Sequence, residues 1–205
     1  MKSKIILITI IALVALLAWL LYDQYAPAKP SQEGKLPASK LSVNDEGLIE
    51  VVLPENLLGG KTAEDFYIEA LSNSEYQKLL TKVEINDDGR ITEFYTPEQL
   101  EQQRQNNYTY AQYHKSFNVK SIKEVIFENE MLTEITVFVD KPVYGGELFE
   151  RTMCNALLAV HAGKYQILTG VPPDEWHTTI TIIDINTEEV LSIVDFPQEG
   201  MYNIL

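Results

Sequence analysis

Apolar residues fill the chain from residue 5 to residue 22, with Thr9 as the single polar interruption. As a helix, a stretch of this length spans roughly 27 Å, close to the ~30 Å hydrocarbon core of a bilayer. Trp19 and Tyr22 stand at its far end, where amphipathic rings prefer the level of the lipid headgroups. The pattern therefore predicts a transmembrane signal anchor over residues 5–22.

Basic residues set the expected orientation of this anchor. Lys2 and Lys4 precede it, and no further basic residue follows until Lys29. The positive-inside rule places residues 1–4 in the cytoplasm and the C-terminal part outside the membrane. An alternative stays open, because Ala26-Pro27-Ala28 has the small-x-small pattern of a cleavage site, and cutting near Ala28 would give a secreted protein. The apolar run exceeds the usual length of about 7–15 residues in a cleaved signal peptide, which favours the anchor.

Polar and helix-breaking residues predict a flexible tether over residues 23–46. The stretch holds Pro27, Pro30 and Pro37 among serines and a glycine, and it has no apolar periodicity. We expect a folded extracytoplasmic domain over residues 47–205.

Alternating apolar and polar positions predict strands in this domain, and apolar positions at helical spacing predict helices. Asp88-Gly89 lies between two alternating segments and indicates a two-residue hairpin turn, because both residues tolerate a positive φ. Pro97 suits the first turn of a helix, and Gly170 ends one. The expected elements are a strand at residues 48–53, helices at 62–80, 98–117 and 147–169, and hairpins at 83–94, 122–139 and 176–196.

Hairpins between the helices favour an α+β fold rather than a doubly wound parallel sheet. We expect one antiparallel sheet of about seven strands, mostly arranged as hairpins, with three helices packed on it. The helix at residues 147–169 carries the widest apolar surface and should lie across the sheet as the main core element.

The charge of the chain excludes one class of partner. The 205 residues carry a formal net charge of −14. Only Lys2 and Lys4 among the 16 basic residues, and none of the 30 acidic residues, precede residue 23, so the remainder has a net charge of −16. Such a chain repels the phosphates of nucleic acids, and we expect no binding to DNA or RNA.

No sequence pattern predicts a metal, a cofactor or a catalytic residue. His114, His161 and His177 lack the spacing of a zinc site, and His161 is expected to be a packed, hydrogen-bonded side chain. Cys154 stands in an apolar helical stretch, which favours a buried structural thiol over a nucleophile.

A tyrosine-rich stretch within the polar helix is the candidate interaction surface. It contains Tyr108, Tyr110 and Tyr113, and tyrosine offers contact area at a small cost in side-chain entropy. The alternative is that these rings are ordinary half-buried aromatics. Helical spacing predicts that Tyr110 and Tyr113 face the sheet and that Tyr108 lies on another side of the helix.

Several short, turn-rich segments resemble an uncharacterised family of secreted or membrane-attached proteins of Gram-positive bacteria. Some members carry an automatic label that refers to the N-terminal domain of streptococcal antigen I/II. The family brings no known catalytic residues, and its members are often attached through a lipobox cysteine. This chain lacks such a cysteine, so its attachment would depend on residues 5–22. The segments that carry the resemblance are residues 53–60, 83–89, 170–174 and 182–197.

These observations lead to a functional expectation. We expect a membrane-anchored, non-enzymatic binding or interaction module at the cell envelope, without a cofactor, whose partner is a protein or an envelope polymer. The alternative is a cell-envelope enzyme or enzyme inhibitor with a site built from carboxylates and tyrosines.

The predicted topology is testable with a reporter enzyme that is active only outside the cytoplasm. Fused after Leu205, the reporter should be active, because the anchor delivers the C-terminal part to the exterior. The same fusion without residues 5–22 is the control and should be inactive. Activity confined to a reporter that works only in the cytosol would contradict the prediction.

Overall fold

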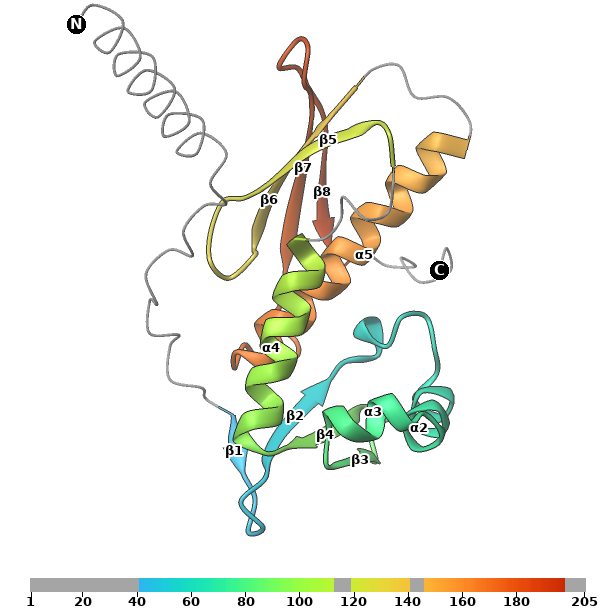
Figure 1. Cartoon of the computed structure of the whole chain (residues 1–205), viewed down its shortest axis with the longest axis vertical. Coiled ribbons are helices and arrows are strands. Elements are labelled where there is room, and N and C mark those ends of the chain that lie inside the picture. The colour runs from blue at the N-terminus through green and yellow to red at the C-terminus, as the bar shows by residue number, and fades with distance from the viewer. Residues whose placement is uncertain (1–40, 113–118, 141–145, 198–205) are drawn as a thin grey trace, which may run out of the picture. The chain divides into compact units, whose positions relative to one another are not determined.

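Two four-stranded sheets and four α-helices make up the described part of the chain, in an α+β arrangement (Figure 1). The computed structural model describes residues 41–112, 119–140 and 146–197, and for residues 146–149 the backbone alone. Within these ranges no helix combines the length and apolarity needed to cross a bilayer. The predicted anchor at residues 5–22 lies outside the described residues.

The first sheet is antiparallel throughout, with the strand order β1-β2-β4-β3. Its central strand β4 is buried at every position, whereas β3 at the edge is half exposed. The sheet begins inside the predicted tether, because β1 pairs Ser42 with Glu50 and Val43 with Ile49. The folded domain therefore starts earlier than residue 47. The strands are β1 (Ser42–Val43), β2 (Ile49–Leu53), β3 (Lys82–Ile85) and β4 (Ile91–Tyr95).

The second sheet has the strand order β5-β6-β7-β8 and is mixed, since β6 and β7 run parallel. The expectation of one antiparallel sheet of about seven strands was wrong, because the described strands form two sheets of four strands and β6 and β7 run parallel. A 23-residue helix, α5, connects β6 to β7, and such a crossover returns the chain beside the strand it left and in the same direction. The strands are β5 (Ile122–Phe127), β6 (Glu134–Val139), β7 (Thr178–Asp184) and β8 (Val190–Phe196).

Four α-helices replace the three that the sequence predicts, because the expected helix at residues 62–80 is divided in two. Asn73 has an extended backbone (φ −94°, ψ 110°), ends the first helix and accepts a hydrogen bond from the Glu75 backbone N–H of the second. An asparagine favours such a cap because its side chain replaces a missing helical partner. The helices are α2 (Ala63–Ser72), α3 (Ser74–Leu79), α4 (Pro97–Gln112) and α5 (Gly146–Leu168), with a short 3-10 helix η1 (Glu55–Leu57).

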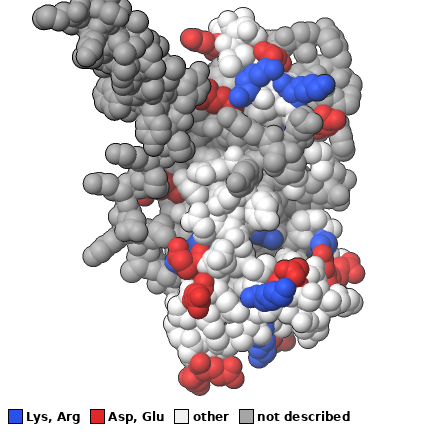
Figure 2. Space-filling model, in the orientation of Figure 1, with Lys and Arg blue, Asp and Glu red and all other residues white. Residues whose placement is uncertain are grey.

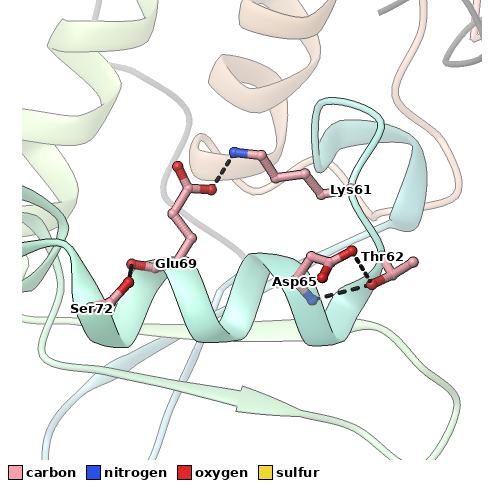
Figure 3. Close-up of polar contacts among 5 residues, drawn as sticks. All are labelled: Lys61, Thr62, Asp65, Glu69 and Ser72. Atoms are coloured by element: carbon pink, nitrogen blue, oxygen red, sulfur yellow. Dashed lines mark hydrogen bonds and ion pairs between the residues drawn. The ribbon is translucent and has the colours of Figure 1, made fainter.

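Helix α2 begins where the sequence indicates. The Thr62 hydroxyl oxygen accepts a hydrogen bond from the Asp65 backbone N–H at 3.1 Å and thus caps the helix (Figure 3). Lys61, just before the cap, forms an ion pair with Glu69 two turns along the helix.

The hairpin between β3 and β4 differs in detail from the expected two-residue turn. Gly89 N–H donates to Asn86 O at 2.9 Å, and Asn86 N–H donates to Arg90 O at 2.8 Å. Asp87 and Asp88 thus occupy the centre of the turn, and Gly89 follows with φ 80°. This is a three-residue loop, in which the glycine takes the left-handed position that it adopts without steric cost.

Helix α5 contacts both sheets and lies alongside α4 (Figure 1). It approaches η1 and the loop before β7 closely because position 163 has no side chain. A Cβ atom there would lie 2.6 Å from Trp176 Cε3 and 3.0 Å from Leu57 Cδ2. Trp176 is held in place by the hydrogen bond that its Nε1–H donates to Asn56 Oδ1 at 3.2 Å.

We predict that Gly163→Ala lowers the free energy of unfolding by about 1–3 kcal/mol, because overpacking outweighs the gain of about 1 kcal/mol in helix propensity. Denaturant titration of the purified protein measures the change. In a Trp176→Phe background the same substitution should cost less, since the ring atoms nearest to position 163 are gone. An equal cost in both backgrounds would contradict the steric explanation.

Candidate binding pocket

A pocket of about 200 Å³ opens between the first sheet, α3, α4 and α5. Helix α4 contributes four polar or aromatic side chains at the spacing i, i+3, i+4, i+7, which places them on one face of the helix. Helix α5 contributes three residues on one of its own faces in the same way. The lining residues are Leu53, Tyr76, Leu79, Glu93, Tyr95, Gln103, Asn106, Asn107, Tyr110, His161, Lys164 and Leu168.

Glu93 brings a carboxylate into this pocket from the middle of β4. It lies between Val51 on β2 and Val83 on β3, and it is only 5% exposed. The Tyr95 hydroxyl, two residues along the same strand face, donates a hydrogen bond to Glu93 Oε2. Burial raises the pKa of Glu93, while Lys164 and the hydrogen bond from Tyr95 act in the opposite direction.

The tyrosines around Glu93 stay protonated at neutral pH. Burial, followed by the charge of Glu93, raises the pKa of Tyr95 well above its ordinary value. The same two causes, in the same order, raise the pKa of Tyr76. The Tyr76 hydroxyl can therefore act as a hydrogen-bond donor in the pocket, whereas the proton of the Tyr95 hydroxyl is already donated to Glu93.

Lys164 brings the opposite charge into the pocket from α5. Burial lowers its pKa, and Glu93 raises it. Its Nζ lies 5.9 Å from the centroid of the Phe66 ring on α2, a cation–π distance. Among the ion pairs of the described residues, none joins Lys164 to Glu93.

His161 lies one turn before Lys164 and is fixed by two neighbours from α4. Its ring stacks on Tyr110 with centroids 5.2 Å apart, and its Nδ1 lies 3.1 Å from Asn107 Oδ1. The Asn107 amide nitrogen donates to Gln103 O at 3.0 Å, so the oxygen faces the histidine. Burial, and then Lys164, lowers the pKa of His161 to about 4, and the neutral ring donates through Nδ1–H.

The tyrosines of the candidate interaction surface do not share one surface. Tyr108 packs against Phe127 and Tyr165, with ring centroids 6.3 and 5.3 Å away. Tyr110 is 58% exposed and lies at the pocket. The expected orientations of Tyr108 and Tyr110 were therefore wrong, because Tyr108 faces the core. Tyr113 lies outside the described residues.

The structure also shows the surroundings of the cysteine and of two histidines that the sequence analysis considered. Cys154 is 2% exposed, and burial raises the pKa of its thiol to about 11, which confirms the expected buried cysteine. His161 is packed and hydrogen-bonded, as predicted. His177 is exposed at the start of β7, and His114 lies outside the described residues. Within the described residues, no group of His, Cys, Asp and Glu side chains has the geometry of a metal site.

Sequence reasoning did not identify Glu93 and Lys164. A signal for Glu93 was present, because Ile91, Glu93 and Tyr95 alternate on one face of a strand and a glutamate between two large buried residues is unusual. The residues next to Lys164 in the sequence do not distinguish it from a solvent-exposed lysine on a helix. Only the packing of α5 against the first sheet brings the two residues together.

Charges on the face drawn in Figure 2 are dispersed. On the face drawn in Figure 2, the described acidic and basic side chains occur in small groups of mixed sign rather than in one continuous acidic area, despite the net charge of −14. This distribution favours recognition at a local site over attraction of a partner by one extended field.

Comparison with known proteins leaves the pocket as the main structural basis for inferring function. No protein-family model, curated protein or solved structure matches this chain. The resemblance described from the sequence stays an expectation.

The lowered pKa of His161 predicts a loss of stability in acid. As pH falls from about 6.5 to about 4, the unfolded chain takes up the proton before the folded protein does, which destabilises the fold by on the order of 3 kcal/mol. Above pH 6.5 the ring is neutral in both the folded and the unfolded chain, and this destabilisation is absent. A His161→Gln variant should lose less stability over this range, as measured by denaturant titration at pH 7 and pH 4.5. An unchanged pH dependence in the variant would contradict the prediction.

Proposed function

We propose that this chain is a membrane-anchored, extracytoplasmic binding domain that holds a small polar ligand in the pocket between the first sheet and helices α3, α4 and α5. The observation that carries the proposal is the convergence of Glu93, Lys164 and three tyrosines on one cavity from β4, α3, α4 and α5. Concave sites with an apolar wall and a few convergent polar groups are typical of ligand pockets.

The size of the pocket limits the ligand. Its volume is about 200 Å³. Sites for drug-sized ligands are larger, about 300–1,000 Å³. The pocket therefore suits a small metabolite, or the end group of a larger molecule such as an envelope polymer or a protein.

Binding without catalysis fits the set of groups in the pocket. Glu93 is the only carboxylate among the lining residues, whereas most glycoside hydrolysis requires two. Tyr95 already occupies one oxygen of Glu93. A nucleophile paired with a base is also missing from these lining residues, since His161 donates its Nδ1–H to Asn107 and no serine or cysteine lines the pocket.

One observation favours a second candidate, a cell-envelope enzyme or enzyme inhibitor with a carboxylate and tyrosine site. Glu93 is buried, has a raised pKa and contacts a tyrosine, which are features of general acids. Turnover of an envelope substrate by the purified chain, lost in a Glu93→Gln variant, would establish this candidate in place of the first.

The proposal predicts that filling the pocket abolishes ligand binding. We expect ligand-observed NMR on the full chain in detergent to detect binders among amino acids, sugars and short-chain acids. Asn106→Trp should abolish their binding, because Asn106 lines the pocket. Gln105→Trp is the matched control, since Gln105 is the exposed neighbour on the same helix, and it should bind like the wild type. Binding that survives Asn106→Trp would place the site elsewhere.

A further inference from the structure

Two charged side chains of opposite sign, the buried Glu93 and the half-buried Lys164, line the pocket without forming an ion pair with each other. Glu93 comes from β4 and Lys164 from α5, and both face the same cavity. A separate contact within the protein holds each of the two side chains. The Tyr95 hydroxyl holds Glu93 Oε2, and the ammonium group of Lys164 lies over the Phe66 ring.

A second carboxylate that acts on Lys164 does not neutralise it. Glu69 on α2 acts on the pKa of Lys164, but its carboxylate forms an ion pair with Lys61 (Figure 3). Lys61 itself adds a positive charge on that side of Lys164. A ligand that fills the pocket must therefore replace the contacts with water that it takes from Glu93 and Lys164.

This requirement distinguishes classes of ligand by their charge. A neutral ligand leaves both charges buried without an ionic partner, and burial of an unpaired charge is strongly unfavourable. An anion pairs with Lys164 but is repelled by Glu93. A cation pairs with Glu93 but is repelled by Lys164. Only a ligand with both charges pairs with both side chains.

The other residues that line the pocket indicate the chemical character of the uncharged part of the ligand. Leu53, Leu79 and Leu168 supply apolar surface, and the amides of Gln103 and Asn106 supply hydrogen bonds at the α4 side. We infer that the pocket binds a small zwitterion with an aliphatic group, of the size of an amino acid such as leucine, whose carboxylate meets Lys164 and whose ammonium meets Glu93. This inference rests on the proposed binding function and specifies its ligand class.

A series of three probes on the unmodified full chain tests the inference. Leucine carries both charges, leucinamide carries only the ammonium, and N-acetylleucine carries only the carboxylate. In calorimetric titration of the chain in detergent, we expect leucine to bind at least ten-fold more tightly than either analogue. Equal or tighter binding of one analogue, or no binding of leucine, would overturn the inference.

Variants then assign each charge to its partner. Glu93→Gln should weaken leucine binding at least ten-fold and leave the affinity for N-acetylleucine unchanged or higher. Lys164→Met should weaken leucine binding equally and spare leucinamide. Glu124→Gln and Lys120→Met are matched controls on exposed residues of the other half of the domain and should bind as the wild type. If the pocket variants do not fold, the probe series on the wild type still decides the question.

Failure of the inference is distinguishable from failure of the proposed function. If neutral N-acetylglucosamine binds, loses binding in Asn106→Trp and is preferred over leucine, the zwitterion inference is wrong while the pocket stands as a binding site. If leucine binds equally well to wild type and Asn106→Trp, both the inference and the proposed site are wrong.

Discussion

Helix α5 packs against β2 of the first sheet, β7 of the second sheet and the length of α4, and the arrangement of the described domain depends on these contacts. Its buried residues are mostly small or aliphatic, with Ala159 and Ala162 fully buried and Gly163 against Trp176. A helix that is apolar on most of its circumference is stable only where other elements cover it on several sides. Neither sheet alone offers that cover, which explains why both sheets assemble around one helix.

The same helix supplies the polar end of the pocket. His161, Lys164 and Leu168 follow at i, i+3 and i+7, so one face of α5 turns towards β4 and α4 while the others build the core. Placing Lys164 there costs stability, since a leucine would pack against Phe66 without a desolvation penalty. Such departures from the ordinary preference for apolar core residues concentrate at functional sites, and here Glu93 departs from it in the same cavity.

The local elements of this fold were predictable from the sequence, but their assembly was not. Thr62, Pro97 and Gly170 set helix boundaries through capping and backbone restrictions that act within a few residues. The parallel pairing of β6 with β7 depends on where α5 docks, which alternation within each strand does not reveal. The α+β class was therefore correct, whereas the single antiparallel sheet was not. Glu93 and Lys164 escaped notice for the same reason, because they meet only through tertiary packing.

The polar groups of the pocket differ in how many of their contacts are made within the protein. Asn107 donates to Gln103 O and accepts from His161 Nδ1–H, and the His161 ring stacks on Tyr110, so these contacts are made within the protein. Such a network stabilises the α4–α5 contact whether or not a ligand is present. Glu93 and Lys164 are different, since neither forms an ion pair with a described side chain. A fold that holds two opposite charges apart in one small cavity is preorganised for a ligand with the complementary pair, because the cost of burying the charges is met during folding rather than on binding.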